Sequence, residues 1–278
     1  MSKQDILDGA VEYATFITSH IPQKDNANNI TYYFSGSLAM LLMASAKNIA
    51  FIGADNDGDI KFISPQQKIS AETQHAFKKG ARPLSTDIDI VAIRDDIFAH
   101  KGIYYNLANI RKNCHLATEL CPAWSKLCGT MYFDILSDER IIDNHNMSII
   151  ELANDRKVLI VNPIDLMLHK LSETIYLKTK SKQTDKYEKD IKDLACLLSG
   201  IISMDIIPEN FEEYIAEVMK NNSTSSISRN LIHNHETEIE AITADLKHHI
   251  DKHTYEKVKK VIATITSFNK SISQNQPQ

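Results

Sequence analysis

Apolar and polar positions along the first part of the chain follow a mixture of helical and strand periods. Residues 4–20 carry apolar side chains at helical spacing, which predicts an amphipathic opening helix. The segment NITYYFSGS predicts a strand that ends at Gly36. The apolar run LAMLLMASA follows it and predicts a buried helix, because no polar face interrupts the run. Two further short strands are expected at SIIEL and KVLIV.

Two more strands are expected at DIDIVAI and TMYFDILS, with a helix over about 97–120 between them. Before them, residues 54–80 turn polar, and Asn56, Asp57 and Gly58 predict a turn in what we interpret as an insertion.

The pattern changes after Asn162, where the remaining apolar segments are helical in period. Asn162 is a plausible N-cap and Pro163 suits the first helical position. The fold class expected is therefore α+β. We predict a mixed domain over residues 1–160, a helical domain over 161–268 and a disordered polar tail over 269–278. The helical segments are NPIDLMLHKLSETIYLK, KYEKDIKDLACLLSG, PENFEEYIAEVMK and HTYEKVKKVIATITSF.

Composition limits the classes of function. A net charge of -5 over 278 residues argues against a protein that coats nucleic acid non-specifically. A local basic groove is still compatible with this net charge. No signal core or membrane span is evident, so we expect no membrane partner and a cytoplasmic location. The four cysteines lack CxxC pairing and are interpreted as reduced structural thiols. The histidines fit no strong zinc template and are expected at the surface: His169, His233, His235, His248, His249 and His253.

Two aspartates stand inside the apolar strand of RPLSTDIDIVAI. Because side chains alternate along a strand, Asp87 and Asp89 share one face. Asp134 lies in the middle of YFDIL, and if that strand is adjacent, a third carboxylate joins the pair across roughly 5 Å. Three close carboxylates call for a neutralising cation, and their hard oxygens suit Mg²⁺. The alternative is an edge strand with a solvated acidic face.

A second feature is the strand-to-helix junction FSGSLAM. Gly36 permits close approach of a phosphate to the backbone, and Ser37 opens a helix whose free N–H groups favour anions. The alternative is a simple turn with no ligand.

Gly36 and Ser37, then RPLSTDIDIV, then YFDIL together resemble the ordered motifs of the nucleotidyltransferase superfamily, whose fold is a small mixed sheet flanked by helices. The aspartate motif looks most like the AbiEii branch of toxin nucleotidyltransferases. VNPIDLMLHKLSE resembles that branch's lysine-bearing helix, and KDIKDLACLL resembles its Arg-Asp-Leu-x-Asp-Leu motif. The matching positions are Arg82, Ser85, Asp87, Ile88, Asp89, Lys170, Lys189, Asp190, Ile191, Asp193 and Leu194.

The resemblance implies a role for each matched residue. Asp87 and Asp89 would hold one or two Mg²⁺ ions and the triphosphate, and Asp134 would be the third ligand or the base. Lys170 would contact a phosphate, and Asp190 would be an acidic residue of the site. Gly36, Ser37 and Ser85 would hold nucleotide phosphates.

Some positions depart from the family pattern or have a plainer interpretation. Lys189 replaces an arginine, Glu173 replaces a small apolar residue, and about fifty residues separate Gly36 from Asp87. Lys170 could equally be a solvated helix lysine. Asp190 and Asp193 share a helix face and could instead pair at the surface with Lys186 or Lys189.

The resemblance implies a Mg²⁺-dependent nucleotidyltransferase, an enzyme that moves a nucleoside monophosphate from an NTP to a hydroxyl and releases pyrophosphate. By the toxin branch, the acceptor would be the 3′ end of tRNA and the partner a cognate antitoxin. Two alternatives stay open. One is transfer to a small molecule, as in antibiotic-modifying relatives, and the other is a non-catalytic binding or regulatory module.

Overall fold

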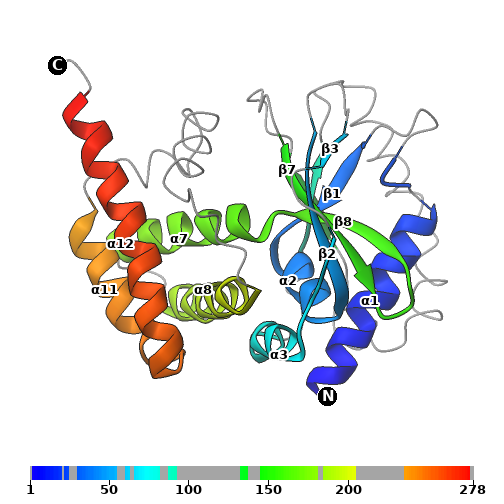
Figure 1. The fold of residues 1–278 in the computed structure, drawn as a ribbon, viewed down its shortest axis with the longest axis horizontal. Coiled ribbons are helices and arrows are strands. Elements are labelled where there is room, and N and C mark those ends of the chain that lie inside the picture. The colour runs from blue at the N-terminus through cyan, green and yellow to red at the C-terminus, as the bar shows by residue number, and fades with distance from the viewer. Residues whose placement is uncertain are drawn as a thin grey trace. The chain divides into compact units, whose positions relative to one another are not determined.

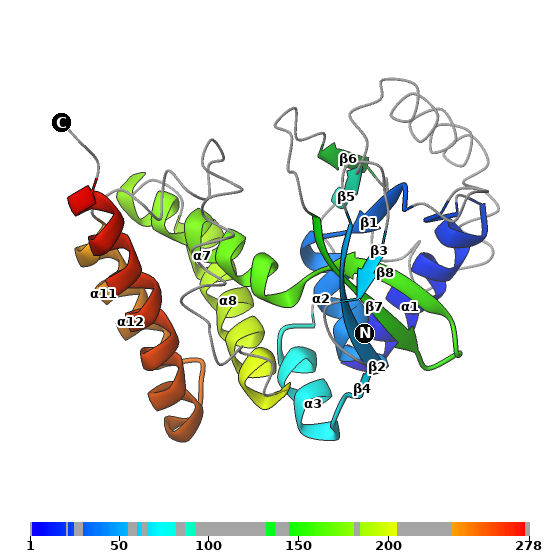
Figure 2. The same cartoon turned by 45° about the horizontal axis from the view of Figure 1, so that its top comes forward.

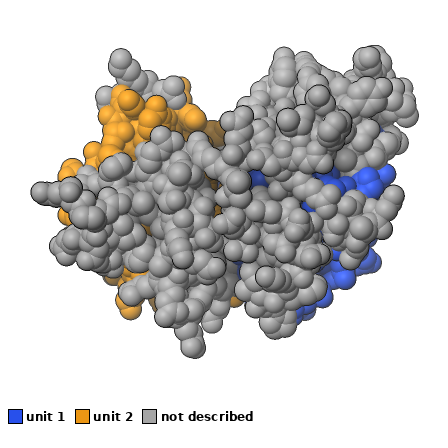
Figure 3. Space-filling view, turned by 90° about the horizontal axis from the view of Figure 1, so that it is seen from above, with its two compact units in different colours: residues 1–162 blue, residues 163–278 orange. Residues whose placement is uncertain are grey.

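The chain forms two compact units, residues 1–162 and 163–278, in the computed structural model (Figure 3). The boundary predicted from the sequence lies near residue 160. The structure describes residues 2–20, 22–24, 30–54, 60–62, 66–81, 87–92, 132–136, 145–180, 184–204 and 235–275.

Unit 1 is built on a mixed eight-stranded sheet with helices packed on it, so the α+β class is confirmed (Figure 1). The strand order is β3-β2-β7-β8-β1-β5-β6, and β4 pairs with β2. The strands are β1 Tyr32–Phe34, β2 Ala46–Ala54, β3 Ile60–Phe62, β4 Gln67–Lys68, β5 Asp87–Ala92, β6 Tyr132–Leu136, β7 His145–Leu152 and β8 Lys157–Val161.

Helix α2 (Gly36–Ala44) is the buried helix that the apolar run predicts. Every residue of it except Ser37 is buried. It packs against α1 (Lys3–His20) and α3 (Ala71–Lys79), so apolar side chains all around the helix are covered. Strand β2 begins at Ala46, two residues after the end of α2. The sequence pattern did not predict this strand, because the apolar run of the helix continues into it. Its middle residues, Ile49 to Ile52, are buried on both faces, so they carry no alternation that would mark a strand.

Residues 54–80, interpreted as an insertion, belong in their described parts to the fold of unit 1. β3 and β4 both pair antiparallel with β2. Helix α3 begins after Ser70, whose hydroxyl accepts a hydrogen bond from the Thr73 amide at 3.1 Å, and it buries Phe77. The segment therefore extends the sheet and adds a helix against α2.

Unit 2 consists, in its described part, of two pairs of helices. α7 (Pro163–Lys180) packs on α8 (Thr184–Met204), and α11 (Glu236–Leu246) packs on α12 (Lys252–Asn275). The sequence pattern did not single out α11. Helix α12 continues to Asn275, into the stretch expected to form a tail. Asp245 links three of these helices, because its carboxylate accepts hydrogen bonds from Tyr187 at 2.6 Å and Lys178 at 3.1 Å.

Several sequence predictions lie outside the described residues. They include the helix expected over 97–120, the segment PENFEEYIAEVMK and the residues Arg82, Ser85, Cys114, Cys121, Cys128 and His233. Among the residues that are described, no helix is both long enough and apolar enough to cross a membrane.

Candidate functional site

The three strand aspartates occupy neighbouring positions at one end of the sheet. Strands β5 and β6 are parallel, and their register pairs Asp89 with Asp134 and Asp87 with Tyr132. Asp87 and Asp89 are two residues apart, so alternation places all three aspartate positions on one face of the sheet. The strand that bears Asp134 therefore lies beside the strand that bears Asp87 and Asp89, as the expected third carboxylate required. Figure 2 shows β5 and β6 continuing the sheet beyond β1.

The start of α2 lies at the same end of the sheet. β1 is antiparallel to β5, with Phe34 opposite Ile90. Extending this register past the last pair sets Ser35 level with Asp89 and Gly36 level with Ile88. Ser35 is the N-cap of α2, and α2 contacts β5. The topology therefore brings the glycine–serine junction beside the strand that carries the two aspartates.

Gly36 has a backbone φ of 56°, in the left-handed region that glycine enters without a steric penalty. The residue is buried and forms the first position of α2. Glycine is therefore required here by the backbone conformation of the junction. Ser37, one residue on, is half-buried.

The residue types at this end of the sheet fit a magnesium site. Three carboxylates on paired strands provide the hard oxygen ligands that Mg²⁺ prefers, and the helix start offers N–H groups for phosphate oxygens. The structure describes the backbone at these aspartates. Among the side chains that it does describe, no group of three or more histidines, cysteines or acidic residues is arranged to hold a metal ion.

Unit 2 holds a separate charged cluster between α7 and α8. The Lys170 ammonium lies 2.7 Å from Glu173 Oε2 and 3.4 Å from Asp190 Oδ1. The Lys170 side chain is 13% exposed and that of Asp190 only 2% exposed, so Lys170 is not a solvated helix lysine. His169 Nε2 lies 3.6 Å from the other oxygen of Glu173.

Burial and charge move the pKa values of this cluster in different directions. Burial raises the pKa of Asp190 more than the neighbouring Lys170 lowers it. For Glu173, burial also raises the pKa, but His169 and Lys170 together hold it far below its ordinary value. Burial lowers the pKa of Lys170, and the charges of Glu173 and Asp190 outweigh burial and raise it. Glu173 and Lys170 therefore form a charged pair at neutral pH.

The second oxygen of Asp190 sets this residue apart. Asp190 Oδ2 is buried and has no hydrogen-bond partner among the described residues. Asp193 is also buried, at 1% exposure. Asp190 forms its salt bridge with Lys170, so the alternative of a surface pair with Lys186 or Lys189 does not describe Asp190.

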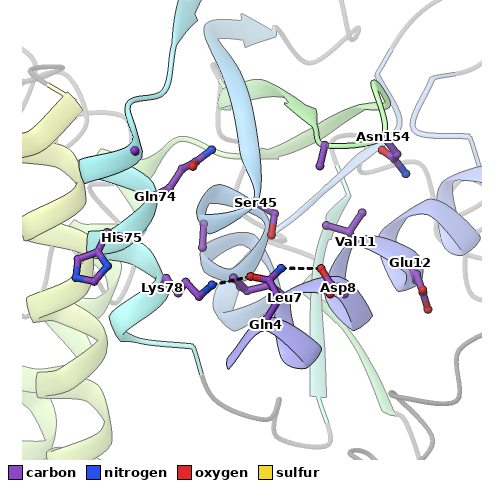
Figure 4. Close-up of a pocket in the computed structure, with 13 residues that line it drawn as sticks. Gln4, Leu7, Asp8, Val11, Glu12, Ser45, Gln74, His75, Lys78 and Asn154 are labelled. Atoms are coloured by element: carbon purple, nitrogen blue, oxygen red, sulfur yellow. Dashed lines mark hydrogen bonds between the residues drawn. The ribbon is translucent and has the colours of Figure 1, made fainter. Parts of the chain in front are cut away.

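A pocket of about 610 Å³ lies elsewhere in unit 1, and the sequence did not indicate it (Figure 4). It is lined by residues of α1, α3 and the C-terminal end of α2, whereas Gly36 begins that helix about 13 Å away. Its polar side chains bind one another: Lys78 donates to Gln4 at 2.6 Å, and Gln4 donates to Asp8 at 2.8 Å. The pocket is thus distinct from the aspartate positions.

Comparisons of the chain with protein-family models, with curated proteins and with solved structures gave no match.

Proposed function

We propose that the protein is a Mg²⁺-dependent nucleotidyltransferase that acts at the β5–β6 end of the sheet. The observation that carries the proposal is the pairing of Asp89 with Asp134 in adjacent parallel strands, with Asp87 two residues away. The start of α2 beside β5 supports it, because a nucleotide needs a phosphate contact next to the metal ligands. The motif resemblance to nucleotidyltransferases supports the same reaction.

The proposed reaction is a displacement at the α-phosphorus of an NTP. The acceptor hydroxyl oxygen forms a bond to the α-phosphorus, the bond from that phosphorus to the bridging oxygen breaks, and pyrophosphate leaves with the electron pair. Asp134 would take the hydroxyl proton, while Asp87 and Asp89 would hold Mg²⁺. Bound Mg²⁺ would stabilise negative charge on the attacking and leaving oxygens. The N–H groups at Gly36 and Ser37 would bind phosphate oxygens.

The roles proposed for unit 2 rest on the resemblance. Lys170 would contact a phosphate, and Asp190 would be an acidic residue of the site. Within unit 2, Lys170 is already engaged by Glu173, so a phosphate would compete with that carboxylate. For the acceptor, the resemblance favours the 3′ end of tRNA, with a cognate antitoxin as the partner that controls the enzyme.

The test is incubation with each α-labelled NTP, Mg²⁺ and total RNA, followed by sizing of the labelled products. We expect label in RNA of tRNA length. Substitution of the metal ligands, Asp87→Asn with Asp89→Asn, should lower the rate by at least about a thousandfold, because charge stabilisation in the transition state is lost. Asp155→Asn is the matched control, since Asp155 is exposed and its positive φ of 61° is tolerated by asparagine.

Two outcomes would contradict parts of the proposal. Label that enters an added aminoglycoside or lincosamide and not RNA would replace the acceptor and keep the reaction. Absence of any transfer, together with equal Mg²⁺-dependent NTP binding by the wild type and the double variant, would overturn the metal site and favour a binding module.

A further inference from the structure

The turn between α11 and α12 carries a local excess of positive charge. We name residues 247–260 the basic turn; they comprise the turn itself and the first nine residues of α12. They contain five lysines and two acidic residues, a formal charge of +3 in a chain whose net charge is -5. The two helices lie side by side in Figures 1 and 2, and the turn joins them. The basic turn therefore lies wholly within unit 2.

Most of these cations face solvent without an internal partner. Lys247, Lys252, Lys257 and Lys260 are exposed, and none of them forms a salt bridge within the described part of the chain. Three exposed histidines stand among them: His248, His249 and His253.

The acidic residues nearby are already engaged. Glu256 binds Lys259 at 2.6 Å. Asp251 accepts hydrogen bonds from the backbone amides of Thr254 at 3.0 Å and His253 at 3.1 Å, which caps α12. Both acids of the basic turn thus have close structural partners, and neither forms a salt bridge with the four exposed lysines.

Three lysines of the basic turn lower the pKa of the same residue, Glu256. The hydrogen bond with Lys259 lowers the pKa of Glu256, and the charges of Lys252 and Lys247 lower it further. Lys247 directly follows α11, and Lys252 is the first residue of α12. Their charges therefore converge on the same surface.

The positive charge of Lys252 at the start of α12 does not stabilise that helix. Lys252 is the first residue of the helix, and the first turn contains no acidic residue. The helix dipole is positive at this end and disfavours cations by about 0.3–1 kcal/mol each. A local conflict of this kind is expected where a surface serves binding.

The exposed positions also form a row. His253, Lys257 and Lys260 are spaced by four and three residues, so they lie on one face of α12, about one helical turn apart. No large apolar side chain is exposed in the basic turn, and Ile250 within it is buried. Membrane surfaces and protein partners are usually bound with apolar or aromatic anchors, whereas nucleic acids are bound through their phosphates.

We propose that the basic turn binds the phosphodiester backbone of a nucleic acid. The proposal does not depend on nucleotidyl transfer, because its residues belong to unit 2, the aspartates belong to unit 1, and the binding requires neither NTP nor Mg²⁺. The contact is one of charge, so it carries no sequence preference.

The test measures fluorescence anisotropy of labelled 30-nucleotide RNA and of DNA with the same sequence, without NTP or Mg²⁺, over a range of salt concentrations. The variant replaces Lys247, Lys252, Lys257 and Lys260 by alanine. The matched control replaces four other exposed lysines by alanine and so has the same net charge: Lys68, Lys79, Lys157 and Lys180. Far-UV circular dichroism confirms that both variants are folded.

We expect the basic-turn variant to lose at least about tenfold in affinity at 0.1 M salt. The slope of log K against log salt concentration should flatten by about 2 to 3, since each lost phosphate contact removes about 0.7 on a single strand. The control should keep both values. The RNA and DNA arms identify which nucleic acid is bound more tightly.

Three results would overturn the proposal. The first is equal loss of affinity in the two variants, which would mean that net charge alone matters. The second is an unchanged salt slope in the basic-turn variant. The third is tighter binding of the wild type to phosphatidylserine vesicles or to polyglutamate than to either nucleic acid, which would assign the surface to a membrane or an acidic protein.

Discussion

The two units differ in how their clustered acidic positions are neutralised. At the β5–β6 end of the sheet in unit 1, three aspartate positions share one face, so neutralising them calls for a cation from outside. Between α7 and α8 in unit 2, Lys170 supplies the cation from within, held by Glu173 and Asp190.

The two clusters are determined by different features of the structure. The aspartate positions are set by backbone register, so any residues at these places would be neighbours. The Lys170 cluster is set by side-chain packing and by the balance of burial against Coulomb attraction. A register can be inferred from strand patterns, whereas that balance depends on how deeply each carboxylate is buried.

The largest change in stability is expected when the cation of the Lys170 cluster is removed. Lys170→Met should lower the free energy of unfolding by about 3 kcal/mol, because it leaves the Asp190 carboxylate buried without its cation. Adding Asp190→Asn should restore much of that loss, since the uncompensated charge is then removed. Urea unfolding followed by circular dichroism measures both changes.

Lys178→Met is the matched control for that experiment. Lys178 pairs with Asp245 at 3.1 Å, but the two side chains are 34% and 41% exposed, so solvent screens the pair. Its loss should cost about 1 kcal/mol or less. Equal costs for the two substitutions would show that burial does not distinguish the Lys170 pair.

A smaller effect is expected at the junction in unit 1. Gly36→Ala should destabilise the protein by about 1–2 kcal/mol, because alanine is forced into the left-handed region at φ 56°. Gly80→Ala is the control, since Gly80 has φ -80° and alanine adopts this conformation freely. Thermal unfolding of the two variants gives the comparison, and a control that is as unstable as Gly36→Ala would refute the backbone argument.

The smallest effect concerns Glu173 and depends on pH. The folded-state pKa of Glu173 is lowered, so its stabilising contribution is present above the unfolded-state pKa of about 4.3 and is lost as the pH falls through the lower folded-state pKa. Glu173→Gln should therefore cost up to about 1 kcal/mol at pH 7, after allowance for partial exposure, and less at pH 4.

Unfolding by urea at both pH values measures that cost. Glu188→Gln provides the comparison, because Glu188 forms an exposed pair with Lys192, four residues along the same helix. A cost for Glu173→Gln that grows on acidification would contradict the assigned direction of the pKa.

Much of the fold was predictable because its signals are local. The opening helix, the buried α2, the strands β7 and β8, and the helices α7, α8 and α12 follow from periodicity over short windows. β2 was missed because burial on both faces removes alternation, and residues 54–80 were interpreted as an insertion because β3 and β4 are too short to show a period.

The sequence by itself determined that Asp87 and Asp89 share a face, since alternation is a property of any strand. It also predicted a strand-to-helix junction beside a buried helix, although the structure ends β1 at Phe34 and makes Gly36 the first residue of α2. Only the tertiary structure decided that Asp134 lies opposite Asp89, because pairing between strands distant in sequence depends on the whole sheet. Tertiary packing likewise decided that Lys170 of α7 lies against the buried Asp190 of α8, because that contact joins two helices.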